Sequence, residues 1–262
     1  MDSSQKISRK IRVVVGIPTQ GFTQAESLNC LFLFAMHIGI FQTQHPEFEF
    51  FFCPRGRMYV AMNRETIMQK ALDLGADYVF FVDDDMIFEA DIFEKLYRHK
   101  VDLVAALAFT RNPPHLAVMY KTEQGWDPIM HREYYTTDWI RNYPRNKLVE
   151  VDAVGFGCVL INLNTVKNME TPYFMSSTGT GEDITFCINF KKSGGRIFMD
   201  TSTIIGHLSN PTIIDQKTSE KFNEPEMMEN IYGTYERHKV FDVCFDRPVK
   251  DAEKLEPVVL GK

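Results

Sequence analysis

Short runs of almost uninterrupted apolar residues constrain the fold of this chain more than any other feature. Ile11–Ile17 (IRVVVGI), Tyr78–Val82 (YVFFV) and Val101–Phe109 are such runs. A strand with apolar residues on both faces has to be covered on both faces, as in parallel sheets with helices on each side. These runs therefore predict strands in the middle layer of a layered domain.

The segments between these runs have the periodicity of helices. Glu26–Ile40 predicts a mostly buried helix, and Met62–Leu74 carries its apolar residues on one face, with Gly75 positioned to end the helix. Strands that alternate with helices predict an α/β fold: one Rossmann-like domain with a mostly parallel central sheet flanked by helices. In such sheets ligands gather at the carboxyl ends of the strands.

The 262 residues suffice for one large domain with a sizeable core. We expect this domain to span residues 11–210, after a polar leader at 1–10 and before a charged extension at 211–262. Within the domain, residues 111–147 are polar and aromatic with poor periodicity. This segment predicts a long excursion from the sheet, and such excursions are often functional.

Charge and cysteine content narrow the class of protein. A net charge of −6 argues weakly against a general nucleic-acid binder, although a local basic groove stays open. The five cysteines are scattered and never spaced CxxC, which disfavours a disulfide framework or structural zinc and favours a reducing compartment. No apolar signal sequence is visible, and Cys30–Phe41 has about half the length of a membrane span. We expect a cytoplasmic protein with no integral membrane segment.

Three adjacent aspartates, Asp83, Asp84 and Asp85, follow the run Tyr78–Val82. Their carboxylates repel one another and are costly to desolvate unless a cation neutralises them. In extended backbone Asp83 and Asp85 lie on one side and Asp84 on the other. Two carboxylates on one side suit Mg²⁺ or Mn²⁺, with positions left open for a diphosphate. A solvated acidic turn is the alternative.

A second acidic pair opens the helix expected over Glu182–Ser193. Thr180 as N-cap with Asp183 in the first turn is a capping interpretation, and the local pattern alone favours it. The functional alternative is a general base for a hydroxyl nucleophile.

Two further side chains have one functional and one structural interpretation. Arg64 could bind a phosphate or ribose, but an arginine on the surface is the commoner case. His207 could complete a metal site begun by carboxylates, but a lone histidine near a strand end is more often structural.

The order of these elements along the chain is more specific than any one of them. It runs GIPTQG, Asn63-Arg64, the apolar strand ending in Asp83–Asp85, VDAVGFGCVLI, GEDITFCINFKKSGGRIF and GHL. This order resembles the GT-A glycosyltransferases, most closely the bacterial and phage members related to glycosyltransferase family 2, over roughly Arg12–Leu208. The resemblance implies a GT-A domain that moves a sugar from a nucleotide-sugar, by default a UDP-sugar, to a hydroxyl acceptor. It also implies a divalent metal cofactor, Mn²⁺ or Mg²⁺, and inversion at the anomeric carbon, although retention stays open.

The resemblance implies a role for each matching residue. The residues expected to contact the donor are Pro18, Thr19, Gln20, Arg64, Asp83, Asp84, Gly155 and Gly157. The two glycines would leave room for the sugar where a side chain would obstruct it. The expected metal ligands, from the DxD motif and the downstream histidine, are Asp83, Asp85 and His207. Asp183 would be the base, and Glu182 would contact the acceptor or the donor sugar.

The acceptor and the oligomeric state stay open. A saccharide, a lipid-linked sugar, a protein or modified DNA would each fit a hydroxyl acceptor, which we expect on the side of residues 111–147. A phage-type enzyme that glycosylates hydroxymethylated DNA bases would use the aromatic residues of this excursion together with its basic ones. Those basic residues are Arg111, Lys121, Arg132, Arg141, Arg145 and Lys147.

Three other classes of protein are less favoured. A nucleotidyltransferase would carry a basic residue in its first loop, and GIPTQGF has none. A chain-extending synthase would carry membrane segments and a glutamine/arginine-rich motif. A non-catalytic nucleotide-sugar-binding module is the remaining alternative. It is disfavoured because the chain keeps both DxD acids, the acidic pair and His207 together.

Overall fold

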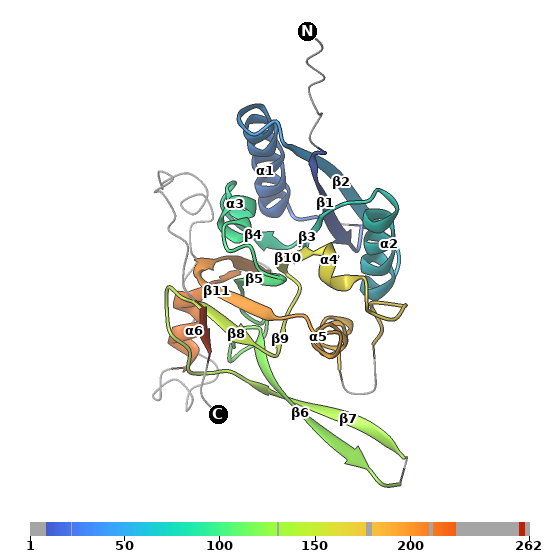
Figure 1. Cartoon of the computed structure of the whole chain (residues 1–262). Helices are drawn as coiled ribbons and strands as arrows, with labels where there is room; N and C mark the ends of the chain where they lie inside the picture. The colour runs from blue at the N-terminus through green and yellow to red at the C-terminus, as the bar shows by residue number, and fades with distance from the viewer. Residues whose placement is uncertain are drawn as a thin grey trace.

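A central sheet runs through the molecule, with strand order β14-β8-β11-β5-β10-β3-β1-β2 (Figure 1). The computed structural model describes residues 9–21, 23–129, 131–176, 180–209, 212–223 and 257–259. In chain order these eight strands are β1 (Ile11–Thr19), β2 (Phe48–Gly56), β3 (Tyr78–Val82), β5 (Leu103–Leu107), β8 (Leu148–Val151), β10 (Cys158–Asn162), β11 (Ile197–Ile204) and β14 (Pro257–Val259).

The described strands of this sheet pair in both directions. The pairs β1–β2, β1–β3, β5–β11 and β8–β14 are parallel, whereas β10 is antiparallel to both β3 and β5, and β8 is antiparallel to β11. The expected α/β class, with helices flanking a central sheet, is confirmed. The antiparallel β10 sits between the two parallel parts of the sheet.

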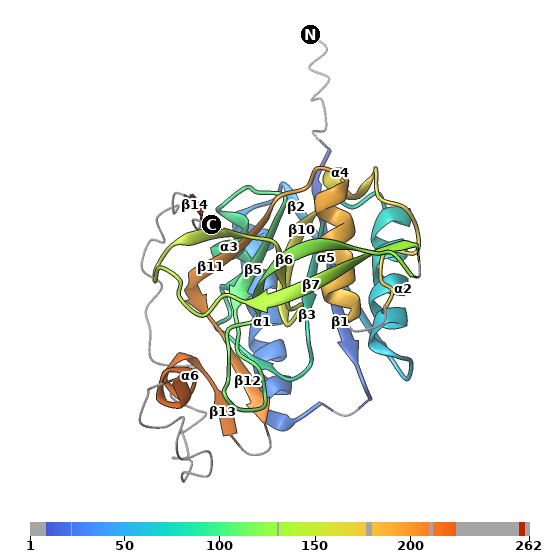
Figure 2. The same ribbon diagram turned by 90° about the horizontal axis from the view of Figure 1, so that it is seen from below.

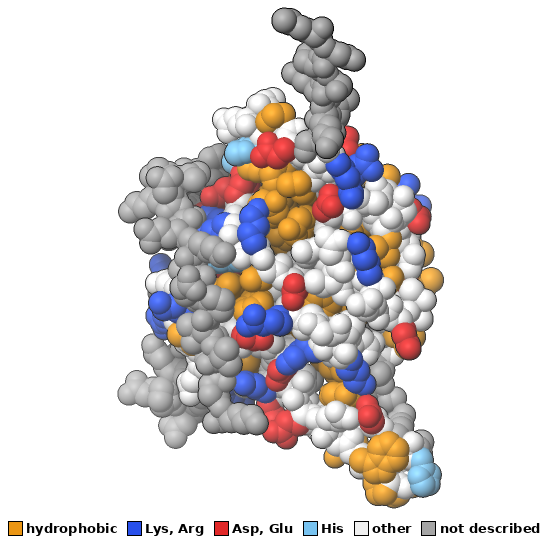
Figure 3. All heavy atoms as spheres, viewed as in Figure 1, with side chains coloured by type: hydrophobic (Ala, Val, Ile, Leu, Met, Phe, Trp, Pro, Cys, Tyr) orange, Lys and Arg blue, Asp and Glu red, His pale blue; other side chains and the backbone are white. Residues whose placement is uncertain are grey.

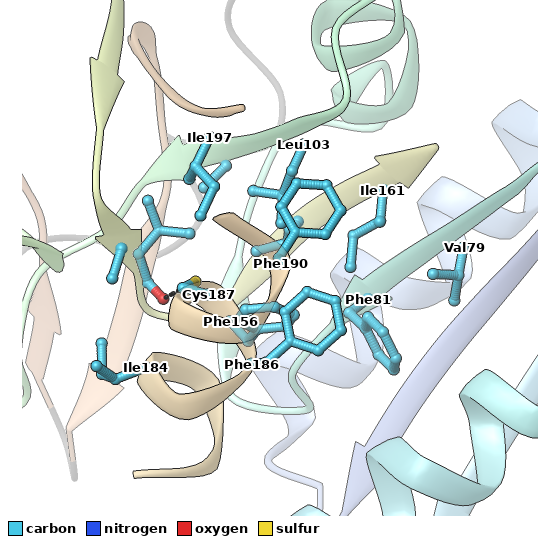
Figure 4. Close-up of a cluster of buried hydrophobic side chains, with 14 of the residues drawn as sticks. Val79, Phe81, Leu103, Phe156, Ile161, Ile184, Phe186, Cys187, Phe190 and Ile197 are labelled. Atoms are coloured by element: carbon cyan, nitrogen blue, oxygen red, sulfur yellow. Dashed lines mark hydrogen bonds between the residues drawn. The ribbon is translucent and has the colours of Figure 1, made fainter. Parts of the chain in front are cut away.

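Helices cover both faces of the sheet, and the side chains of β1 alternate between them. Val13 and Val15 pack with α1 (Ala25–Gln44) and α3 (Ile92–Tyr97) on one face. Val14 packs with α2 (Val60–Asp73), α4 (Leu163–Val166) and α5 (Glu182–Lys192) on the other. The α5 side of this core is rich in phenylalanine (Figure 4). The apolar run at Ile11–Ile17 is therefore buried from both sides, as its composition predicts.

Strand β1 continues through Pro18 to Thr19, two residues beyond the apolar run Ile11–Ile17. Pro18 is in register with Arg55 of β2, and Thr19 with Gly56. The extra residues carry the loop that follows β1 further along the edge of the sheet.

Two small sheets lie beside the central one. The first joins β4 (Met86–Ile87), β12 (Gly206–Ser209) and β13 (Thr212–Ile214), and β13 is followed by helix α6 (Gln216–Asn223). The second joins β6 (Met119–Asp127), β7 (Arg132–Trp139) and β9 (Ala153–Val154). β6 and β7 form a long hairpin inside the expected excursion 111–147. The hairpin passes along α5 (Figure 2), where Lys192 pairs with Glu133 at 3.2 Å.

Helix α1 is the one helix among the described residues that is long and apolar enough to cross a membrane. Its buried side chains, Cys30, Phe34, Ile38 and Phe41, pack against the sheet. Its opposite side exposes Leu28, Phe32, Met36 and Ile40, so the expectation of a mostly buried helix is wrong.

A buried carboxylate, Asp200 of β11, is held by hydrogen bonds from several elements. Its Oδ2 accepts from His99 Nε2 at 2.8 Å and from Thr203 Oγ1 at 2.8 Å, and its Oδ1 accepts from Ser202 N at 2.9 Å. Burial alone would raise the pKa of Asp200, but these donors outweigh it and lower the pKa to about 2. The ionised carboxylate therefore stabilises the folded state.

We predict that Asp200→Asn lowers the free energy of unfolding at pH 7 by about 2–3 kcal/mol, from a pKa difference of roughly two units. The folded pKa lies below the unfolded value of about 3.9, so this contribution is complete above about pH 5 and is lost progressively toward pH 2. Urea unfolding from pH 7 to pH 2.5 measures it, with Asp138→Asn on the exposed side of β7 as control. A stability difference between wild type and Asp200→Asn that stays constant down to pH 2.5 would contradict the assignment.

Candidate functional site

The acidic run lies where β3 ends, and backbone contacts fix it from two sides. The Asp83 amide donates to the Gly157 carbonyl at 2.9 Å, and the Leu208 amide donates to the Asp85 carbonyl at 2.9 Å. The run is therefore placed by the segment before β10 and by β12, as well as by β3.

A small cavity of about 80 Å³ opens beside this run. It forms here because β1 and β3 are parallel neighbours, so the segments that leave their carboxyl ends meet at one edge. Its lining residues come from the end of β1, the start of α2, the residues next to these elements and the acidic run: Pro18, Thr19, Gln20, Met58, Val60, Asn63, Asp83, Asp84 and Asp85. The structure thus brings together the three residues expected beside the nucleoside and the three aspartates.

Asn63 is a cavity residue that the sequence analysis did not place in the site. Its Nδ2 donates to the Met58 carbonyl at 3.2 Å and to the Thr19 carbonyl at 3.4 Å. Its Oδ1 is buried without a hydrogen-bond partner. A buried, half-satisfied amide at the wall of a cavity is positioned to bind a ligand. Its place beside Arg64 in the sequence was the available signal.

Arg64 of α2 is buried, with 4% of its side chain exposed, so its interpretation as a surface arginine is wrong. Its Nη2 donates to both carboxylate oxygens of Asp83, at 2.7 and 2.9 Å, and its Nη1 donates to Glu182. Its guanidinium lies over the Phe156 ring, 5.6 Å from the centroid. Burial would lower the pKa of Arg64, but the carboxylates of Asp83 and Glu182 outweigh it and raise the pKa. The guanidinium points at these acids, and its expected contact with a nucleotide stays a prediction.

Asp83 accepts from Arg64 with both of its carboxylate oxygens. Burial raises the pKa of Asp83 to about 6 against the opposing effect of Arg64, so the ion pair is formed at neutral pH. Because Asp83 faces Arg64, it stands apart from the pair formed by Asp85 and His207.

Asp85 and His207 face each other across the β4–β12 pairing. His207 is in register with Met86, and its Nε2 lies 3.4 Å from Asp85 Oδ2. His207 Nδ1 is 2.9 Å from the Phe109 carbonyl, to which it donates, so in the neutral ring Nε2 carries the lone pair. Arg111 donates to Asp85 Oδ2 and lies 3.2 Å from His207 Nε2. Although burial opposes it, His207 and Arg111 lower the pKa of Asp85.

The residues present fit a divalent ion with two protein ligands. Asp85 Oδ1 is buried without a hydrogen-bond partner, which leaves an acceptor for a cation. Two ligands bound at about 2.1 Å, at angles near 90–110°, lie roughly 3.0–3.4 Å apart. The 3.4 Å between Asp85 Oδ2 and His207 Nε2 falls within that range. Asp83 does not join them, and within the described part of the chain no group of three or more His, Cys, Asp or Glu side chains is arranged to hold a metal.

The acidic pair at the start of α5 is joined to the same network. Gly181 is the N-cap residue and no side chain caps the helix, so the interpretation of Thr180 as the N-cap is wrong. Residues 177–179, which precede this helix start, lie outside the described residues. Asp183 Oδ1 accepts from the Ile184 amide at 2.8 Å. Burial raises the pKa of Asp183 against the opposing effect of Arg64, which favours a carboxylate that can take up a proton.

The two expected donor-site glycines lie against the protein's own side chains. A Cβ on Gly155 would meet Val118 Cβ at 3.0 Å, and one on Gly157 would meet Met86 Cε at 2.9 Å. Neither glycine lines the cavity. Internal packing therefore explains why small residues are needed here, and a contact with a donor sugar stays a prediction.

The β6–β7 hairpin extends away from the body of the molecule, with hydrophobic side chains at its outer end (Figure 3). Trp126, Ile129 and Tyr134 are exposed there. At its base the rings of Tyr120 and Trp139 lie 4.5 Å apart. Burial, and next the Asp183 carboxylate, raise the pKa of Tyr120, which places the base of the hairpin on the side of the acidic pair.

Comparison with known proteins gives a fold and no family. No protein-family model matches the chain, and no curated protein matches its sequence. A197 from STIV is similar in structure at 20% identity and a TM-score of 0.50, over 78% of this chain and 94% of that one. A structure of GalNAc-T7 with UDP, GalNAc and Mn²⁺ matches at 10% identity and a TM-score of 0.44, over 75% of this chain and 42% of that one. The similarity to A197 concerns the fold alone. The similarity to the GalNAc-T7 structure is too distant to support a conclusion about this protein.

We predict that Arg64→Met destabilises the protein by about 3–5 kcal/mol, because it keeps the side-chain volume and leaves two buried carboxylates without their cation. Arg145→Ala is the control, since the exposed pair between Arg145 and Glu220 contributes less than about 1 kcal/mol. Urea unfolding of the three proteins measures both effects. Equal losses in the two variants would show that the Arg64 network is not a structural element.

Proposed function

We propose that this protein is a glycosyltransferase, which transfers a sugar from a nucleotide-sugar to a hydroxyl acceptor. The observation that carries the proposal is the cavity shared by the loop after β1 and the aspartates after β3, with Asp85 and His207 set 3.4 Å apart beside it. A nucleoside, a diphosphate with its metal ion and a sugar need such adjacent polar and metal-ligating groups. The preferred donor is a UDP-sugar.

The donor would lie with its nucleoside against Pro18, Thr19 and Gln20. Asn63 adds a buried amide oxygen that could accept a hydrogen bond from the base or ribose. Asp84, on the same wall, would face the nucleotide, and the segment of Gly155 and Gly157 would approach the sugar.

Asp85 and His207 would hold Mn²⁺ or Mg²⁺, and the diphosphate would complete the coordination shell. When bound, the ion would neutralise the charge that develops on the departing nucleoside diphosphate. Asp83, expected as a third ligand, would act beside this site through its ion pair with Arg64.

Asp183 would act as the general base in an inverting displacement. Its carboxylate would accept the proton of the acceptor hydroxyl while that oxygen forms a bond to the anomeric carbon. The bond from the anomeric carbon to the diphosphate oxygen breaks, and its electron pair leaves with the nucleoside diphosphate. Glu182, fixed by Arg64, would hold the start of α5 so that Asp183 faces the sugar.

The acceptor would approach from the side of the β6–β7 hairpin. The exposed rings of Trp126 and Tyr134 suit stacking on a sugar or on a base. A saccharide, lipid-linked or protein acceptor is the first choice, because the net charge of −6 disfavours DNA. Steep salt dependence of activity on hydroxymethylated DNA would instead support the phage-type DNA glycosyltransferase. In this proposal residues 11–210 form the catalytic domain of a cytoplasmic enzyme.

We predict that the protein releases the nucleotide of one donor in a panel of UDP-, GDP-, CMP- and dTDP-sugars, a nucleoside diphosphate or, from a CMP-sugar, CMP, and that EDTA stops the release. Asp85→Ala should abolish it, because the ion would lose a ligand. Asp73→Ala, at the exposed C-terminal end of α2, is the matched control and should keep full activity. If the enzyme releases no nucleotide until an acceptor is bound, calorimetry still measures whether it binds UDP in the presence of Mn²⁺. If the protein neither binds a nucleotide nor releases one, the proposal is refuted. If it binds a nucleotide with the metal ion but turns over no donor, it is a non-catalytic nucleotide-sugar-binding module.

We predict a different outcome for Asp183→Asn. This variant should bind UDP and Mn²⁺ as the wild type does, because Asp183 does not line the cavity. Its release of nucleoside diphosphate should fall by about 10²–10⁴-fold, the usual contribution of a general base. Full activity in Asp183→Asn would show that another group is the base.

A further inference from the structure

We infer that Arg111 is an internal, displaceable cation that holds the metal site closed until a divalent ion and the donor diphosphate displace it. This inference rests on the proposed function and adds regulation of the same site. The Arg111 guanidinium donates to Asp85 Oδ2, and its Nη2 and Nε lie 3.2 and 3.3 Å from His207 Nε2. These two acceptor atoms are the pair whose 3.4 Å separation fits a divalent ion.

The ion and the guanidinium would need the same lone pairs. His207 Nδ1 is committed to the Phe109 carbonyl, so Nε2 is the one ring atom that can bind either cation. Asp85 Oδ1 would stay available to an ion after Arg111 leaves. Binding of the two cations at Asp85 Oδ2 and His207 Nε2 is therefore mutually exclusive.

Arg111 and Arg64, the two arginines that pair with the acidic run, differ in how deeply they are buried. Half of the Arg111 side chain is exposed, whereas 4% of the Arg64 side chain is. Arg111 follows β5 at the edge of the molecule and can move into solvent without opening a cavity in the core. Arg64 cannot, because it would leave Asp83 and Glu182 buried and unpaired. One arginine is thus fixed, and the other is free to exchange.

Displacement would leave Arg111 beside the place where the diphosphate binds. A guanidinium donates to two phosphate oxygens at once, so the displaced side chain would find a new partner there. Removal of Arg111 should then have opposite effects on two ligands: the ion alone binds more tightly, and the nucleotide diphosphate binds less tightly. A residue that only supports the fold would weaken both or neither.

The experiment measures Mn²⁺ binding to the full chain without nucleotide, from the electron paramagnetic resonance signal of free Mn²⁺. We expect Arg111→Ala to bind Mn²⁺ at least about fivefold more tightly than the wild type, as for the loss of a competing ligand. Arg111→Lys keeps a positive charge and should lie between the two. The matched control is Arg196→Ala, because Arg196 is 58% exposed and pairs with the partly buried Glu150 far from the site. Its Mn²⁺ affinity should equal that of the wild type.

A second titration follows UDP at saturating Mn²⁺, where Arg111→Ala should bind UDP several-fold more weakly than the wild type. Mn²⁺ affinity that is unchanged or weaker in Arg111→Ala, or absent from all variants, overturns the inference, and so does unchanged UDP affinity. Measurement of turnover distinguishes a failure of this inference from a failure of the proposed function. EDTA-sensitive release of nucleoside diphosphate without competition at Arg111 would refute the inference alone. Competition at Arg111 without turnover on any donor and acceptor would refute glycosyl transfer alone.

Discussion

The buried ion network around Arg64 is the interaction on which the site depends. It ties α2 to the end of β3 through Asp83 and to the start of α5 through Glu182. Ions out of water are stable only while their partners stay in place, so the network holds three elements in one arrangement. Gly16 makes that arrangement attainable, because a Cβ there would lie 2.5 Å from Ile67 of α2. A side chain on β1 would push α2, and Arg64 with it, away from the acids.

The acidic run raises an electrostatic problem that the chain resolves with its own residues. Three adjacent carboxylates need cations nearby, and Arg64 and Arg111 supply two of them. The two arginines differ in burial and therefore in what they can do. Arg64 behaves as part of the core, whereas Arg111 lies at the surface, where a salt bridge contributes little and can be exchanged at low cost.

The sequence predicted the layers and the edge that carries the site, because both follow from local pattern. The alternate burial of Val13, Val14 and Val15 toward two sets of helices follows from an apolar run. The sequence did not predict that β10 is antiparallel to its neighbours, because an apolar run does not indicate the direction of a strand. The β6–β7 hairpin was missed because its strands are rich in polar residues and bury few side chains, so no apolar run marks them. The partners of Arg64 and Arg111 are long-range contacts, and spacing does not show them.

A metal site with two protein ligands behaves differently from the three-ligand site that the sequence suggested. With Asp83 committed to Arg64, Asp85 and His207 alone would leave most of the coordination shell to water and phosphate. Such a site binds an ion weakly until a diphosphate completes the shell. The same diphosphate would draw Arg111 away from Asp85, so the ion and the donor would each favour the binding of the other. On the proposed function, the site would therefore assemble only around a bound donor.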